Sequence, residues 1–177
     1  MAITTSCPLP SNINPLSSNG FNFSIQKLPE VTFFCQEANL PSIMLQEVTV
    51  ATPLAYIQEP GEMVTYGQLN IQFLIDENMS NYKAVHNWLI GLGFPKDNQQ
   101  YQDLLNADTS PIKSTEQKVF SDAALQILGS NLQPSQTVRF IDIFPTSLET
   151  LTFQSTATDV QYLVGNATFT CLRYEFD

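Results

Sequence analysis

The chain has 177 residues, enough for one domain whose core needs neither a metal nor a disulfide to hold it. Seven basic and 17 acidic residues give a net charge of −10, which excludes a protein that grips nucleic acid through clustered Lys and Arg. Only 14% of the residues are charged, against ~25% in an ordinary soluble domain. This composition is expected of a surface buried against other subunits, and it also occurs in secreted β-proteins.

Residues 1–20 are rich in Pro, Ser and Asn and show no period, which predicts an extended N-terminal arm ahead of a single domain over residues 21–177. The arm lacks the basic start and continuous apolar run of a signal peptide. No segment approaches the ~18 apolar residues of a membrane span. These features predict a protein made in a cytoplasm, with no membrane partner.

The first strands are predicted from alternating apolar side chains. Phe21–Leu28 alternates with a period of two, and after a Pro-Glu turn Val31–Leu40 is predicted to return as the second strand of a hairpin. Gly67–Asp76 shows the cleanest alternation in the chain. Between them, Ile43–Val50 is β-prone, apolar and nearly free of charge. Such a segment invites strand pairing, so we expect it either to tuck onto its own sheet or to extend the sheet of a neighbour.

The one strongly predicted helix follows Asp76, with Ser80 or Asn81 as its N-cap. Gly91 or Gly93 is expected to end it. Its apolar stripe is predicted to clip one side of a sheet through Tyr82, Val85, Trp88 and Leu89.

The second half of the chain is predicted to be mostly strand. Residues 96–118 are expected to form a polar surface insert with a short helix near Tyr101–Leu105, and residues 119–128 a strand. Gln136–Pro145 is predicted to be a strand with Asp142 on the same face as Val138 and Phe140. Residues 146–159 are expected to form a further strand with its turn. Val160–Phe176 is predicted to close the chain as one long strand with a bulge or bend at Gly165. The total of about seven to nine strands and one flanking helix predicts a mainly β fold, an antiparallel sandwich or barrel.

Catalytic and metal chemistry find little support in the sequence. His86 is the only His, so Ser or Cys nucleophiles have one possible imidazole base, and we expect His86 to face solvent or an interface. Asp76, Glu77 and Asp142 are candidates for a glycosidase pair by residue type alone, and the first two already precede a helix start. We therefore predict neither an enzyme nor a catalytic residue.

Three cysteines, Cys7, Cys35 and Cys171, are widely spaced and form no Cys/His cluster. Cys35 and Cys171 lie in apolar strand patterns and are predicted to be small buried hydrophobes. No phosphate-binding loop occurs. The sequence therefore predicts no metal and no cofactor, and favours a binding or structural protein.

Two segments carry a resemblance to a known family. "LNIQFLIDENMSNYKAVHNWL" (69–89) joins a strand, an acidic break and a helix, and in "FIDIFPTSLETLTF" (140–153) a strand stops at Phe-Pro-Thr and the next one starts. Preceded by "NFSIQKLPEVTFFCQEANLPSI", these segments are similar in order and spacing to the tail tube family of contractile-tailed bacteriophages, including its baseplate tube-initiator relatives. The resemblance covers about residues 20–177.

The resemblance implies a structural virion protein of the tail, assembled in the host cytoplasm. Six copies would form a ring, and rings would stack into a tube that lies inside a contractile sheath, contacts sheath and baseplate proteins, and conducts genomic DNA without binding it specifically. An acidic subunit fits that passage, because a negative lumen repels phosphates. In the family the loop after the second strand reaches the adjacent ring. The corresponding contact residues here are Ile43, Met44, Leu45, Glu47, Val48, Val50, Pro53 and Tyr56.

Three alternatives stay open, and one is a tube of a bacterial contractile injection system, which would share the architecture. The resemblance does not distinguish a main tube subunit from a baseplate tube initiator or a tail terminator, which would share the fold, although the main subunit is favoured. A different class, a monomeric β-sandwich module that binds carbohydrate, would need exposed aromatic side chains. The single Trp88 falls on the apolar stripe of the predicted helix, which argues against such a platform.

Overall fold

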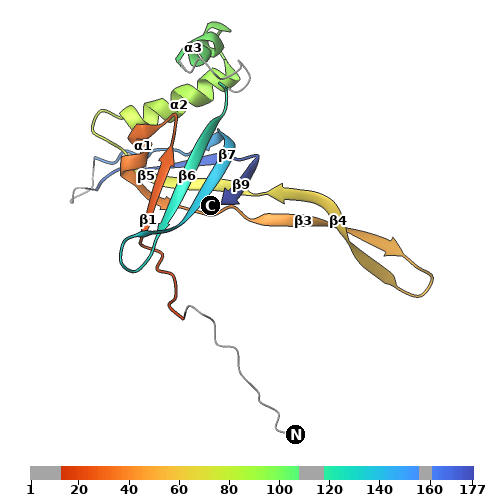
Figure 1. The fold of residues 1–177 in the computed structure, drawn as a ribbon. Helices are drawn as coiled ribbons and strands as arrows, with labels where there is room; N and C mark the ends of the chain where they lie inside the picture. The colour runs from red at the N-terminus through yellow and green to blue at the C-terminus, as the bar shows by residue number, and fades with distance from the viewer. Residues whose placement is uncertain (1–12, 108–117, 156–160) are drawn as a thin grey trace.

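The computed structural model describes residues 13–107, 118–155 and 161–177. In this part of the chain antiparallel strands dominate and three helices accompany them (Figure 1). The elements are β1 (Phe21–Ile25), α1 (Pro29–Phe34), β2 (Cys35–Ala38), β3 (Ile43–Ala51), β4 (Tyr56–Tyr66), β5 (Gln68–Leu74), α2 (Ser80–Gly93), α3 (Gln99–Ala107), β6 (Ser121–Leu128), β7 (Pro134–Leu148), β8 (Val164–Thr170) and β9 (Arg173–Phe176). The predicted mainly β, antiparallel fold is confirmed, and α2 is the predicted long helix.

Strand β7 belongs to both layers of the body. The strand order is β1-β6-β7-β8-β5-β2, and β9 also pairs with β7. The first part of β7 pairs with β6 and β9, whereas Phe144–Leu148 pairs with β8. The strand thereby passes from one sheet into the other. The inner faces of these two sheets enclose the core, as expected for a sandwich whose corner is made by one bent strand.

Asp142 forms the corner of β7. It has a left-handed backbone (φ 53°), and its N–H donates to the Asp122 carboxylate oxygen Oδ1 at 3.2 Å. The register between β6 and β7 shifts at this point, which marks a bulge. The prediction that Asp142 shares a face with Val138 and Phe140 is therefore wrong. The extra residue changes the phase of the alternation, so Ile143 takes the buried position with no exposed area.

Large apolar side chains from both sheets fill the core. Phe23 and Phe140 come from one sheet, and their rings meet edge to face with centroids 6.4 Å apart. Phe73 and Phe169 come from the other sheet and are fully buried. At ~25 cal/mol per Å² of apolar surface, the burial of these rings contributes strongly to the stability of the body.

Helix α2 covers one open side of the sandwich (Figure 1). Val85 and Trp88 are buried, and the Trp88 ring lies 6.0 Å from the ring of Phe169. The indole N–H of Trp88 donates to the carbonyl oxygen of Val119 at 3.1 Å, which satisfies its one polar group. Tyr82 and Leu89, the other two members of the predicted stripe, are half-buried at the border of this contact.

The start of α2 differs from the prediction. Met79, with φ 55°, occupies the N-cap position, and no side chain caps the helix. Asn81 lies inside the helix and is fully buried. Its amide group donates to the carbonyl of Leu74 at 2.7 Å and accepts from the N–H of Tyr82 at 2.8 Å. Asn81 therefore ties the end of β5 to the helix instead of capping it, which satisfies a buried polar group.

The predicted hairpin of Phe21–Leu28 with Val31–Leu40 is wrong. Pro29 begins the short helix α1, which buries Val31 in the core, and only Cys35–Ala38 becomes a strand. That strand pairs with β5, whereas β1 pairs with β6. Proline fits the first turn of a helix because its fixed φ suits that position and its missing N–H is not needed there.

The C-terminal strands also differ from the prediction. Strand β7 runs through Leu148, and residues 149–155 form no strand, so the strand expected over 146–159 is wrong where the structure describes it. The last segment divides into β8 and β9 at Cys171 and Leu172. Gly165 lies in regular register opposite Phe73, so no bulge is present. A Cβ there would lie 3.0 Å from the Phe73 ring, so glycine avoids crowding that ring.

The predicted polar insert is described only in part. Helix α3 occupies Gln99–Ala107 and includes the predicted short helix near Tyr101–Leu105. It packs against α2, and Leu105 is its buried residue. Residues 108–117 of the insert, and 1–12 of the predicted N-terminal arm, lie outside the described residues.

Candidate subunit-contact surface

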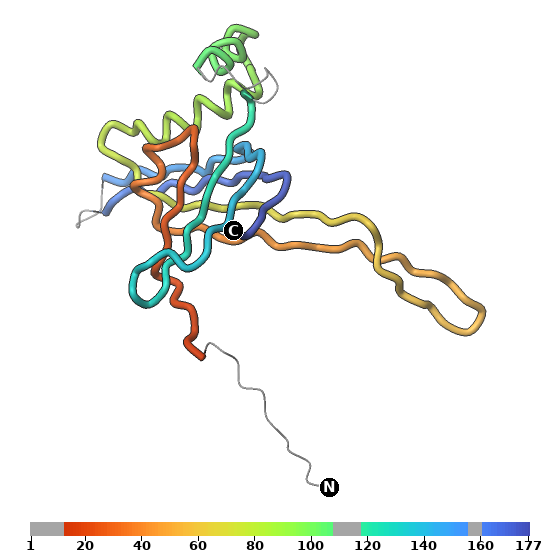
Figure 2. Tube along the Cα trace, in the orientation of Figure 1, coloured from red at the N-terminus to blue at the C-terminus, as the bar shows by residue number. Residues whose placement is uncertain are grey.

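A two-stranded arm projects away from the sandwich. Strands β3 and β4 pair only with each other in the described chain and extend well beyond the body (Figure 2). All nine residues of β3 are exposed. Ten large apolar side chains of the arm, including its tip, are between 40% and 98% exposed: Ile43, Met44, Leu45, Val48, Val50, Leu54, Tyr56, Ile57, Met63 and Val64. Contiguous apolar exposure on this scale marks an interaction site.

The structure brings the predicted contact residues together on this arm. Six of the eight lie on β3: Ile43, Met44, Leu45, Glu47, Val48 and Val50. Pro53 lies in the turn at the tip, and Tyr56 is the first residue of β4. The other strand was missed, together with its exposed residues Ile57, Met63 and Val64. The only signal for it was a weak one, the β-prone residues on both sides of Pro60–Gly61, a pair that normally ends a strand.

The base of the arm is fixed to the body. The N–H of Gly67 donates to the carbonyl of Ser42 at 2.8 Å, which closes the hairpin where both strands enter the sandwich. The rings of Tyr66 and Tyr174 meet at 5.4 Å, and the Tyr174 hydroxyl donates to the carbonyl of Pro41 at 3.1 Å. The arm therefore leaves the body in a defined direction next to β9.

A kink divides the arm into two halves. The register is regular from Ile43 to Leu45 and again from Glu47 to Ala51, but it shifts between Leu45 and Glu47. At the shift, Gln46 on β3 stands opposite three residues, 61–63, on β4. A Cβ on Gly61 would collide with the backbone carbonyl of Gln46, so glycine is required for this close approach.

The arm is acidic as well as apolar. Residues 43–66 include Glu47, Glu59 and Glu62, and none of the seven Lys and Arg residues of the chain. Charged side chains on exposed strands discourage indiscriminate edge pairing. These glutamates therefore disfavour indiscriminate strand pairing along the exposed arm.

The sites that the sequence offered for catalysis do not assemble. His86 is exposed on α2, and Asp142 lies in the corner of β7, where its N–H donates to Asp122. Asp76 accepts a hydrogen bond from the Ser80 hydroxyl, which holds the pKa of its carboxyl below its usual range. Among the residues that the structure describes, no three His, Cys, Asp or Glu residues group so as to hold a metal ion.

The two described cysteines are poor nucleophiles. Burial raises the pKa of the Cys35 thiol to about 11, against a smaller opposing effect of a hydrogen bond with the backbone of Glu37. Burial also raises the pKa of the Cys171 thiol. Because the thiolate is the reactive form, neither thiol is poised for attack. Cys171 is a small buried core side chain, as the strand pattern predicted, whereas Cys35 is only half-buried at the border of the core.

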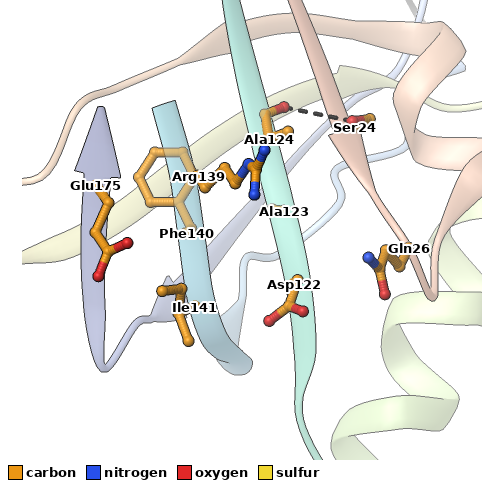
Figure 3. A pocket seen from close by; sticks show the side chains of 9 residues that line it. All are labelled: Ser24, Gln26, Asp122, Ala123, Ala124, Arg139, Phe140, Ile141 and Glu175. Atoms are coloured by element: carbon orange, nitrogen blue, oxygen red, sulfur yellow. Dashed lines mark hydrogen bonds between the residues drawn. The ribbon is translucent and has the colours of Figure 1, made fainter. Parts of the chain in front are cut away.

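A shallow depression lies on the outer face of the sheet formed by β1, β6, β7 and β9 (Figure 3). Its volume is about 490 Å³, and Ser24, Asp122, Arg139 and Glu175 are among its polar residues. Arg139 is 66% exposed in its side chain and forms an ion pair with Asp177 at 2.5 Å. The depression lacks the apolar enclosure typical of a small-molecule site, so the arm remains the better candidate surface.

No helix in the described residues is both long and apolar enough to cross a membrane.

Comparisons with known proteins identify a family and several similar folds. A family model described as phage tail tube protein matches residues 5–177. The fold is similar to a chain of the anti-feeding prophage tube-terminating cap, with a TM-score of 0.59, 15% identity and coverage of 100% of this chain and 99% of that one. It is also similar to a chain of the sheath-tube complex of an extracellular contractile injection system, with a TM-score of 0.56, 14% identity and coverage of 92% and 91%. A chain of the anti-feeding prophage baseplate matches with a TM-score of 0.57, 12% identity and coverage of 92% and 95%. No curated protein matches the sequence.

Proposed function

Because the chain belongs to the phage tail tube protein family and is a structural component of the virion tail, we propose that six copies close into a ring. The rings stack into the tube that conducts DNA inside a contractile sheath. The observation that carries this proposal is the exposed arm, whose apolar side chains have no partner within the described chain. A tube built from copies of one chain supplies that partner.

The sheet edges support lateral closure. Strands β1 and β2 stand at the two ends of the strand order, and β9 pairs on one side only with β7. Open edges of this kind attract further strands, and a closed ring of subunits removes them altogether. A head-to-tail contact closes into a ring when its rotation closes.

The charge of the chain fits a passage for DNA. Each subunit carries a net charge of −10, and this charge multiplies around a ring. A negative wall repels the phosphate backbone, so DNA passes without sticking. The proposed role involves no catalysis. The contacts with sheath and baseplate proteins, and assembly in the host cytoplasm, belong to the same proposal, because the similar folds come from sheath-tube and baseplate assemblies.

The arm is proposed as the contact between stacked rings. It projects far from the body and carries the predicted contact residues along its length. Ile43, Met44 and Leu45 lie near its base, Glu47, Val48 and Val50 lie beyond the kink, and Pro53 and Tyr56 lie near the tip.

Electron microscopy of the purified full chain tests the proposal. Rings of six with a central hole, or tubes made of such rings, are the expected result. Long tubes indicate the main tube subunit, whereas assembly that stops at one ring indicates an initiator or terminator. A chain that stays strictly monomeric at high concentration would overturn the proposal and favour a monomeric binding module.

A further inference from the structure

The two faces of the arm differ in chemistry, and the strand register shows how. Residues directly opposite each other in an antiparallel pair share one face, and successive residues alternate between faces. Beyond the kink, Val50 pairs with Ile57 and Val48 with Glu59 on one face. The other face there carries mainly polar or small residues: Glu47, Thr49, Ala51, Tyr56, Gln58 and Pro60.

Near the body the apolar face is the opposite one. Leu45 pairs with Val64, and Ile43 shares their face two residues away. On β3, Leu45 and Val48 are separated by three positions, so alternation places them on opposite faces of the ribbon. Without a kink, the arm would be apolar on one face in its inner half and on the other face in its outer half.

The ribbon turns over along the arm. In Figure 2, β3 lies below β4 next to the body, and the two strands cross partway along the arm, after which β3 lies above β4. The view therefore meets opposite faces of the ribbon near the body and near the tip. Because the apolar face also switches between the inner and outer halves, both apolar faces point to the same side of the arm.

We propose that this single apolar side is the part of the arm that docks on a second copy of the chain. The kink at Gln46 and Gly61 brings the apolar faces of the inner and outer halves onto that side. The side is formed by Ile43, Leu45 and Val64 in the inner half and by Val48, Val50 and Ile57 in the outer half. These six side chains are 40–53% exposed. The inference rests on the proposed tube function, which identifies the occupant as another copy.

Charge favours the same occupant. The arm has three glutamates and no basic residue, whereas all seven Lys and Arg residues lie elsewhere on the chain. A second copy therefore offers the arm basic side chains that the arm itself lacks, and Glu59, which stands beside Val48 on the apolar side, is the acid placed to meet them. An arm whose paired apolar side chains share one side can lie flat along one neighbouring surface, and it leaves to water the other side, where Met44 and Tyr56 are the exposed large apolar residues.

A matched pair of double variants tests which side docks. Val50→Thr with Ile57→Thr removes one cross-strand pair from the apolar side, and Thr49→Gln with Gln58→Thr exchanges the adjacent pair on the other side. Threonine keeps the strand preference at the two apolar positions. We expect the first variant to raise the concentration needed for assembly by at least ~10-fold and the second to change it by less than about 2-fold, since only the first side loses buried apolar area. Sedimentation velocity with electron microscopy measures both.

A second experiment tests the kink. Deleting Glu62 and Met63 leaves Gln46 opposite Gly61 alone, so the ribbon becomes regular and its apolar faces fall on opposite sides. We expect the body to keep its circular dichroism spectrum and melting temperature while assembly is lost. Adding Thr49→Val, Val50→Thr, Ile57→Gln and Gln58→Ile moves the outer apolar pair to the other face and is expected to restore assembly.

The outcomes separate this inference from the proposed function. If the unaltered chain never forms rings or tubes, the tube proposal itself fails. If the unaltered chain assembles and the two double variants behave alike, the one-sided arm is wrong and the tube proposal stands. An assembly that tolerates the deletion of Glu62 and Met63 would equally overturn the role of the kink.

Discussion

The body and the arm use similar strands in opposite ways. In the body, alternating side chains such as Phe73 and Phe140 point into a core and have no exposed area. In the arm, residues of the same kind, such as Val48 and Ile57, stay about half exposed because the described chain folds nothing over them. A period-two apolar pattern therefore specifies a strand with one apolar face. It does not say whether the same chain or another copy covers that face.

Removing the arm is the most drastic way to test this difference. Replacing Ile43–Tyr66 with a two-residue Gly-Ser link between Ser42 and Gly67 is feasible, since these two residues already share a backbone hydrogen bond. We expect complete loss of ring stacking in electron micrographs and only a small change in the melting temperature, because Tyr66 at the base is the one arm residue that packs against the core of the described chain. Unfolding of the shortened chain would show that the arm belongs to the body.

Trp88→Ala tests how much the packing of α2 stabilises the body. The substitution removes the packing on Phe169 and the hydrogen bond to Val119. It is expected to lower the free energy of unfolding by about 3–5 kcal/mol, as measured by urea denaturation. Leu54→Ala at the tip of the arm is the control, since Leu54 is 98% exposed and its loss costs the monomer nothing. Equal stability of the Trp88 variant and the unaltered chain would refute the idea that α2 clips the sandwich.

The sequence predicted the elements that local signals define. Helix α2 combines a stripe at helical spacing with Gly93 and Pro95 at its end, and β5 alternates cleanly through Leu69 and Ile71, so both were found. The family resemblance predicted contact residues between Ile43 and Tyr56, and these residues lie on the arm, while their contacts stay a prediction. These features depend on side-chain periods and stop residues, which a sequence displays directly.

Features fixed by distant contacts were not predictable. Residues 31–34 have the composition of a strand, but Pro29 and the burial of Val31 between elements make them helical. Asp142 follows the alternation of its strand in sequence, and only its pairing with β6 reveals the bulge that turns it away from the core. Strand β4 was not predicted, because Pro60 and Gly61, which lie at its kink, normally end a strand. Partner strands override local preference in each case.

Gly165→Ala is expected to destabilise the body less than Trp88→Ala does. The new methyl group would lie 3.0 Å from the ring of Phe73, which is fully buried and has little room to move. We expect a loss of about 1–3 kcal/mol in the free energy of unfolding. Gly93→Ala is the matched control, because no heavy atom lies within 4 Å of the added Cβ. If both variants lose the same stability, crowding at Phe73 is not the cause.

The smallest expected effect concerns how the stability of the body depends on pH. The Ser80 hydroxyl donates to Asp76 and lowers the pKa of that carboxyl, so the folded state holds its proton less tightly than the unfolded chain does. A depressed folded pKa adds stability above the unfolded value of ~3.9, and that stability is lost as the pH falls through the folded pKa. Ser80→Ala is expected to raise the pKa of Asp76, measured by NMR titration of its carboxyl carbon, and to reduce this loss in acid. An unchanged pKa in the variant would show that the turn before α2, and not the hydroxyl, sets the charge of Asp76.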